Sequence, residues 1–298
     1  MGTYKLLTWN IGFAGGIHGL EGCLGTKSDV MARLSGMAEV LSKAAADVVC
    51  LQEIDRRSKR SFYVDQVDYL ATQSGYPYQA FVQTWRSWWI PYPITWRLDR
   101  QFGPMDAGQV ILSKYPISWH AHITHEKPPS RRGLFRYFYL DRVSQLVQIA
   151  VPGGDVLRIG HVHFEAFDGV ARMQQAKTLL DRLANGVGGH FSLEGKTLSP
   201  LVLCGDFNAI PQGATRPTVF PDDPNLSYAH DNTLNLFLER GFVSAGSDAT
   251  CQDYPAYAPN RQLTHVFYEQ GLSDVVYRVL PTGCLSDHWP GMLQYVIR

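Results

Sequence analysis

The spacing of apolar and polar positions alternates along the chain between the pattern of strands and the pattern of helices. The first such series lies near the start of the chain. It predicts a strand, a helix and a buried strand, at residues 4–11, 28–47 and 48–53. The helix has Met31, Leu34 and Leu41 on one apolar face, and we expect Ser28 or Asp29 to cap its N-terminus. The beginning of the chain therefore forms a strand–helix–strand unit.

The same series returns in the second half of the chain. It predicts a strand, a helix and a buried strand, at residues 157–164, 169–183 and 201–208. The apolar face of this helix is expected to comprise Val170, Met173, Ala176, Leu179, Leu180 and Leu183. Ligand sites of helix-covered sheets lie beyond the strand ends, so the ends of both units are expected to meet at one cleft.

The segments outside the two units also alternate with the period of strands. Further strands are predicted at residues 106–117, 136–151, 262–269, 273–280 and 291–297. Residues 232–242 predict a short helix. The sequence thus predicts an α/β protein in which two β-sheets pack together with helices outside.

Composition narrows this picture. With 298 residues, 45% of them hydrophobic, the chain can bury one large core, and it contains no linker-like segment, so we expect a single domain over residues 1–298. Lys+Arg and Asp+Glu both number 27, which gives a formal net charge of zero and disfavours tight nucleic-acid binding. Five scattered cysteines, with Cys50 and Cys204 inside apolar runs, favour a reducing compartment. With no signal peptide or membrane span recognised, the predicted location is cytoplasmic.

Polar side chains stand where the apolar runs end. These residues are Asn10, Glu53, His163, Asp206, Asn208, Asp287 and His288. Taken singly, each has an ordinary structural explanation, such as a turn cap for Asp206 or an ion pair with Arg56 for Glu53. Their joint occurrence at strand ends favours a functional site instead. Its hard oxygen donors favour Mg²⁺ or Mn²⁺ over zinc.

The segments TWNI, LQE, HVHF, GDFN and SDH, in this order and at these separations, resemble the signature of the endonuclease/exonuclease/phosphatase superfamily. The resemblance spans residues 4–297. It implies a four-layer α/β/β/α sandwich of two packed mixed β-sheets with outer helices. It also implies hydrolysis of a phosphate ester with Mg²⁺ or Mn²⁺.

The resemblance also implies roles for the polar residues. Asn10, Glu53 and Asp287 would hold the metal. Asp206 would orient and deprotonate the attacking water, and Asn208 would hold Asp206 or the phosphate. His163 and His288 would donate hydrogen bonds to the phosphoryl oxygens. The predicted catalytic residues are therefore His163, Asp206, Asn208 and His288.

Two positions depart from the family pattern. Most members have an Asp that orients the His of SDH, and this chain has Thr264 there. A hydroxyl cannot stabilise an imidazolium as a carboxylate does, so we expect a lowered pKa of His288 or a different carboxylate such as Asp274. The second departure is Gln109, where Asn is usual and an amide is retained.

Variable segments bear on the substrate. The Gly-rich segment 13–29 predicts a flexible rim loop. Residues 84–104 contain four tryptophans, which form either a core plug or a surface patch for lipid, bases or sugars. The basic cluster 56–61 favours a solvated loop, with contact to substrate phosphates as the alternative. The predicted substrate-binding residues are Arg56, Trp88, Trp89 and Arg142.

From these observations we predict a Mg²⁺-dependent phosphoesterase that acts on a small or lipid-linked phosphodiester, with contact to a lipid surface. The neutral charge and the Trp-rich segment support this substrate class. A nuclease acting on DNA or RNA is the chief alternative, and the missing basic surplus disfavours it. The third hypothesis is a binding protein that kept the fold and lost catalysis, and Thr264 is the departure that suggests it. The sequence predicts no oligomeric state.

Overall fold

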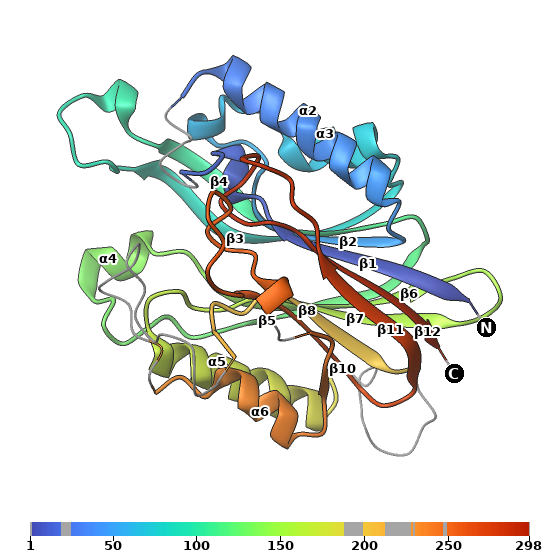
Figure 1. The fold of residues 1–298 in the computed structure, drawn as a ribbon. Helices are drawn as coiled ribbons and strands as arrows, with labels where there is room; N and C mark the ends of the chain where they lie inside the picture. The colour runs from blue at the N-terminus through green and yellow to red at the C-terminus, as the bar shows by residue number, and fades with distance from the viewer. Residues whose placement is uncertain are drawn as a thin grey trace.

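The computed structural model describes residues 2–18, 25–187, 199–211, 228, 230–246 and 249–297. Within these ranges two six-stranded sheets pack face to face (Figure 1). The first sheet has the order β11 (Leu272–Val279), β12 (Gly291–Ile297), β1 (Thr3–Asn10), β2 (Val48–Asp55), β4 (Gly103–Ser113) and β3 (Tyr78–Ile90). The second has the order β5 (Ile117–Thr124), β6 (Val143–Ala150), β7 (Val156–His163), β8 (Leu201–Asp206), β10 (Thr264–Tyr268) and β9 (Val243–Ser244).

Both sheets are mixed, because each contains one parallel pair among antiparallel neighbours. The parallel pairs are β1 with β2 and β7 with β8, the two strand–helix–strand units of the sequence. The helices α2 (Lys27–Ala44) and α3 (Gln66–Ser74) cover the first sheet, and α5 (Gly169–Ala184) and α6 (Thr233–Glu239) cover the second (Figure 1). The predicted four-layer α/β/β/α arrangement is therefore confirmed.

Side chains of each strand alternate between two apolar layers. In β1, Leu7 and Trp9 pack under α2 and α3, whereas Leu6 faces the second sheet. Asn10 follows Leu6 in the same alternation and so points between the sheets. A third apolar layer lies between the second sheet and its helices. Period two thus delivers the polar end of β1 to the interface of the two sheets.

Local predictions failed at several places for identifiable reasons. Helix α2 begins two residues earlier than a Ser28 cap would place it, because Thr26 is the N-cap and forms a capping box with Asp29. Val170 of α5 is exposed, because Arg172 takes a buried position of that helix and pairs with Asp231 at 2.6 Å. Ala176, Leu179, Leu180 and Leu183 are buried as predicted, whereas the start of the helix buries Ala171 and the ion-paired Arg172.

Two further segments also differ from expectation. Residues 136–151 are not one strand, because they begin in the short helix α4 (Gly133–Phe138) before β6. The basic cluster 56–61 is not wholly solvated: Arg60 is buried, pairs with Asp55 at 2.9 Å and stacks over the Phe13 ring at 3.5 Å. The rim loop predicted at 13–29 lies partly outside the described residues.

Among the described residues, no helix is both long enough and apolar enough to cross a membrane.

Candidate active site

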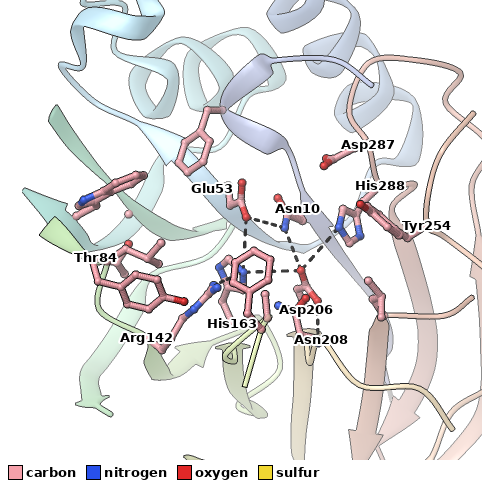
Figure 2. Close-up of a pocket in the computed structure, with 18 of the residues that line it drawn as sticks. Asn10, Glu53, Thr84, Arg142, His163, Asp206, Asn208, Tyr254, Asp287 and His288 are labelled. Carbon is pink, nitrogen blue, oxygen red and sulfur yellow. Dashed lines mark hydrogen bonds and ion pairs between the residues drawn. The ribbon is translucent and has the colours of Figure 1, made fainter. Parts of the chain in front are cut away.

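A cavity of about 340 Å³ opens where β1, β7 and β8 end. It gathers seven residues predicted from the sequence as catalytic or metal-binding and one predicted to bind substrate (Figure 2). They are Asn10, Glu53, His163, Asp206, Asn208, Asp287, His288 and Arg142. Side chains far apart in the sequence therefore line one cavity, as the strand-end argument expects.

Glu53 reaches the cavity through a break in the alternation of β2. Gln52 points between the sheets, where it bonds to Thr8, so regular alternation would send Glu53 toward the helices. Instead Glu53 has a positive φ of 53°, and the register with β4 shifts between Leu51 and Ile54. A bulge with a left-handed residue re-aims this carboxylate into the site.

Asp206 is the last residue of β8, and the preceding Gly205 allows β8 to pack closely against β7. Gly205 has φ of 142°, and a Cβ there would lie 2.0 Å from the carbonyl oxygen of Val162 in β7. Asp206 Oδ1 accepts from the backbone N–H of Asn208 at 2.9 Å, and Oδ2 accepts from Asn10 Nδ2 at 3.0 Å. The carboxylate is thus held from both oxygens.

Two imidazoles approach the same oxygen of Asp206. Nε2 of His163 lies 3.7 Å from Oδ2, and Nε2 of His288 lies 3.8 Å from it. Asn208 contributes through its backbone N–H, since its side-chain amide donates to the carbonyl of Phe164 at 3.0 Å. Asp206 Oδ2 is therefore the centre of the polar network in Figure 2.

The carboxylate that orients His288 is Asp253, which the sequence analysis did not find. His288 Nδ1 donates to Asp253 Oδ2 at 2.9 Å, and the hydroxyl of Thr264 donates to the same oxygen at 2.7 Å. Asp253 Oδ1 accepts from the backbone N–H groups of Leu263 and Thr264. The suggested Asp274 lies exposed on β11, so that interpretation is wrong.

The expected lowering of the His288 pKa is also wrong. Burial does lower it, but the hydrogen bond to Asp253 and the charges of Asp206 and Asp287 outweigh burial and raise the pKa of His288 to about 10. The ring therefore carries a positive charge at neutral pH.

His163 has a different environment. Its Nε2 lies 2.5 Å from Nη1 of Arg142, and because a guanidinium only donates, His163 must accept. Burial and the charge of Arg142 hold the pKa of His163 well below its usual range. Arg142 is itself buried and lies 3.7 Å from Glu165, whose carboxylate also accepts from the Tyr139 hydroxyl. Arg142, rather than His163, thus brings a cation to this wall.

Glu53 and Asp287 are the candidate donors for a metal. Burial and the charge of Asp287 raise the pKa of Glu53 to about 7, and burial raises the pKa of Asp287 as well. A divalent cation between such carboxylates would favour their ionised forms. Within the described ranges, no group of three or more His, Cys, Asp or Glu side chains is arranged to hold a metal ion. Mg²⁺ commonly uses one or two carboxylates and keeps several waters, so the donors fit.

The side chain of Asn10 donates hydrogen bonds to two carboxylates of the site. Its Nδ2 donates to Glu53 Oε1 at 3.2 Å as well as to Asp206, and its Oδ1 accepts from the backbone N–H of Gly12 at 3.1 Å. The side chain thus links the candidate metal ligand Glu53 to the candidate base Asp206.

The predicted substrate-binding residues are not all at the cavity. Arg142 lines it, whereas Arg56, Trp88 and Trp89 do not. Arg56 lies over the ring of Phe81 at 4.9 Å. The tryptophan that does line the cavity is Trp85, which donates to the carbonyl of Phe138 at 2.8 Å.

Aromatic side chains form much of the remaining wall. They are Phe13, Trp85, Phe138, Tyr139, Phe167, Tyr228 and Tyr254. Gln109 is buried behind the site and donates to the carbonyl of His161 at 3.2 Å. The cavity thus combines buried carboxylates and cations with an aromatic surround.

Two mixed sheets pack together, and carboxylate, imidazole and amide side chains gather at their strand ends. This combination is typical of phosphoesterases. The family model described as Endonuclease/Exonuclease/phosphatase family matches residues 7–288. The chain belongs to this family, whose members hydrolyse phosphoester bonds and generally depend on a divalent metal.

Solved structures resemble the chain in fold. A family protein from Beutenbergia cavernae has a TM-score of 0.67 and 19% identity over 100% of this chain and 72% of its own. The mannosyl-6-phosphatase Bt3783 of Bacteroides thetaiotaomicron has a TM-score of 0.65 and 16% identity, covering 99% and 100%. The human Nocturnin catalytic domain with bound sulfate has a TM-score of 0.63 and 18% identity, covering 99% and 95%. No curated protein sequence matches the chain significantly.

Proposed function

We propose that the protein is a phosphodiesterase that uses Mg²⁺ or Mn²⁺ and acts on a small or lipid-linked phosphodiester. The observation that carries this proposal is the position of Asp206, whose Oδ2 accepts from Asn10 and lies within 3.8 Å of two imidazole nitrogens. In-line attack of water on the phosphorus of an anionic ester requires a fixed carboxylate to accept the proton and nearby cations to balance charge, which here are His288 and Arg142.

Each group has a distinct part in the proposed reaction. Asp206, held by Asn208 and Asn10, orients the water and accepts its proton. The cations of His288 and Arg142 stand on two sides of Asp206 and stabilise the charge that grows on the phosphoryl oxygens (Figure 2). Glu53 and Asp287 would hold the metal, which supplies Lewis-acid stabilisation of the phosphoryl group and the leaving oxygen.

The cavity walls support the substrate class. Phe138, Tyr139 and Phe167 offer apolar surface next to the cations, which suits an ester whose organic groups are apolar or ring-shaped. The formal net charge of zero adds no global attraction for a nucleic-acid backbone. A small or lipid-linked diester is therefore favoured over a polynucleotide.

The alternative of an inactive binding protein loses its main motivation. It depended on Thr264 leaving His288 without a carboxylate, and Asp253 supplies one at 2.9 Å. The residues given parts in the proposed reaction all line the cavity, which supports an active enzyme.

Hydrolysis assays on a matched panel test the proposal. Purified protein with Mg²⁺, and with chelator, is given phospholipids in micelles, a soluble aryl phosphodiester, single-stranded DNA, RNA and a phosphomonoester. Metal-dependent cleavage of the soluble diester or the phospholipids, lost in Asp206→Asn, is the expected result. Cleavage of the nucleic acids alone would show that the substrate class is wrong.

A further inference from the structure

Residues 88–101, here called the arm, comprise the end of β3 and most of the segment between β3 and β4. They expose large apolar side chains. Trp96 is fully exposed, and Trp88 and Ile94 keep 76% and 89% of their surface in solvent. Leu98 is also exposed. In Figure 1 the arm projects from the body of the protein at the end where α4 lies. Grouped exposed tryptophan and aliphatic side chains on a soluble fold mark an interaction surface.

The arm is held in shape from its inner side. Lys59 Nζ donates to the carbonyl oxygens of Leu98, Asp99 and Gln101 at 2.8, 3.1 and 2.9 Å. Trp89 Nε1 donates to the side chain of Gln101 at 2.6 Å, and Gln101 donates to the carbonyl of Thr95 at 2.8 Å. These polar bonds fix the arm, while Ile94, Trp96 and Leu98 stay exposed beside Arg97, Asp99 and Arg100. The exposed side chains are therefore presented in a defined arrangement.

The base of the arm is part of the cavity. Trp85 lies in β3, just before the arm, and lines the cavity. Its Nε1 donates to the carbonyl of Phe138 at the end of α4. Phe138 and Trp85 also pack on one apolar cluster with Ile90 and Phe102. The contact between Trp85 and Phe138 thus joins the arm to the α4 segment next to the cavity.

The α4 side carries positive charge. Residues 126–137, here called the lip, contain Lys127, Arg131, Arg132 and Arg136 against the single acid Glu126. Arg132 and Arg136 are exposed. The lip also exposes Tyr137. A strongly basic segment therefore flanks the cavity in a protein whose formal net charge is zero.

We propose that the arm and the lip together form a docking surface for a phospholipid bilayer that contains anionic lipids. Tryptophan and aliphatic side chains of the arm enter the headgroup region, and the arginines of the lip pair with anionic headgroups. Docking in this way brings the cavity mouth to the lipid phosphates. The proposal deepens the proposed function and rests on it for the use of the docked state, whereas the docking itself is independent of turnover.

A bilayer fits this surface better than a single-stranded nucleic acid. Bases stack on aromatic rings, and Ile94 and Leu98 have none to offer. Arg97, the cation in the middle of the arm, is paired with Asp99 at 2.7 Å. Arg100 is exposed and leaves the arm with a formal net charge of +1, whereas the lip carries +3. Most of the positive charge of this surface therefore lies on the lip.

Co-sedimentation with vesicles tests the docking surface. The full chain with Mg²⁺ is mixed with vesicles of phosphatidylcholine alone or with about one third phosphatidylserine. We expect binding to the mixed vesicles and at least about tenfold weaker partitioning of Ile94→Ser/Trp96→Ser, because this variant removes apolar area that the bilayer would bury. Arg132→Glu/Arg136→Glu should abolish the preference for anionic vesicles.

A matched control separates this surface from general hydrophobicity. Leu238→Ser/Val276→Ser removes two exposed apolar side chains from α6 and β11 and should bind vesicles like the wild type. All three variants should hydrolyse a soluble diester at the wild-type rate. The proposal would be overturned if the wild-type protein bound neither kind of vesicle, or if the arm variant bound vesicles as well as the wild type does. So would loss of binding to a single-stranded oligonucleotide in the arm variant with vesicle binding unchanged. Absent turnover of the soluble diester in every form would count against the proposed function and leave the docking result standing.

Discussion

His288 Nδ1 donates to Asp253 Oδ2 at 2.9 Å, and the same carboxylate accepts from the hydroxyl of Thr264 at 2.7 Å. The carboxylate that fixes the imidazole therefore comes from the loop before β10, while β10 itself contributes a hydroxyl. Asp253 is held in turn by two backbone N–H groups. This relationship gives His288 a fixed orientation and a positive charge despite its burial.

Replacing Asp253 with Asn should lower kcat for a soluble diester by about 10²- to 10⁴-fold, because the amide cannot stabilise the imidazolium of His288. KM should change much less. Steady-state kinetics gives both values, and Asp274→Asn, on the exposed bulge of β11, is the matched control with wild-type activity. Equal activity of the Asp253 and Asp274 variants would refute the positioning role.

The double variant Asp253→Thr/Thr264→Asp moves the carboxylate from the loop onto β10. It should recover at least about tenfold of the kcat that the single Asp253→Asn variant loses, since a carboxylate again faces His288. Circular dichroism verifies that each variant is folded. No recovery in a folded double variant would show that only the loop position can orient the ring.

Divalent metal should stabilise the protein through Glu53 and Asp287. Binding to the native state alone raises the melting temperature by mass action, so saturating Mn²⁺ should raise it by a few degrees in the wild type. The shift should vanish in Glu53→Gln and persist in Glu39→Gln, an exposed residue of α2. Thermal unfolding with and without chelator measures it. A full shift in Glu53→Gln would place the metal elsewhere.

Gly205→Ala should be among the most destabilising single changes in β8. An added Cβ would lie 2.0 Å from the carbonyl oxygen of Val162, and φ is 142°, so the strand pair must separate. We expect a loss of at least about 3 kcal/mol in the free energy of unfolding, or no soluble protein. Gly169→Ala, with the nearest atom at 3.6 Å, should be nearly neutral in the same urea titration.

The free energy of unfolding should depend on pH through His125. Burial lowers the pKa of His125 to about 4, against an ordinary value of 6.5. The unfolded state therefore binds more protons between these values, so the stabilisation is complete above pH 6.5 and is lost as pH falls toward 4. Its full size is roughly 3 kcal/mol.

Urea titrations of wild type and His125→Gln at several pH values isolate this contribution. The stability difference between the two proteins should be constant above pH 7 and should change steadily from pH 6.5 to 4. A difference independent of pH across this range would assign the acid sensitivity to other groups.

Much of the fold and site follows from patterns within short segments. Asn10, His163 and Asp206 each end an apolar run, and strands that end together deliver them to one cavity. The segment GDFN shows its glycine and its acid in sequence, and Asn208 does hold Asp206, although through its backbone N–H and not through its amide.

Other parts of the site depend on geometry that no short segment reveals. Glu53 faces the cavity only because its φ is positive, and an Asp, Glu or Asn in a strand gives no local sign of that. Asp253 reaches His288 through the fold of a loop 35 residues away in sequence, without any periodicity to indicate it. The tryptophans of the arm follow no period either, and the bonds from Lys59 that hold the arm join residues about 40 positions apart in sequence.

The central claim is that Asp206 activates water for attack on a phosphodiester. The most direct measurement is hydrolysis of a soluble aryl phosphodiester in ¹⁸O-labelled water with Mg²⁺, by wild type, Asp206→Asn and Asp274→Asn. We predict one labelled oxygen in each phosphate product of the wild type and of Asp274→Asn, and at least about 10²-fold slower turnover in Asp206→Asn. Unchanged turnover in Asp206→Asn would contradict the account.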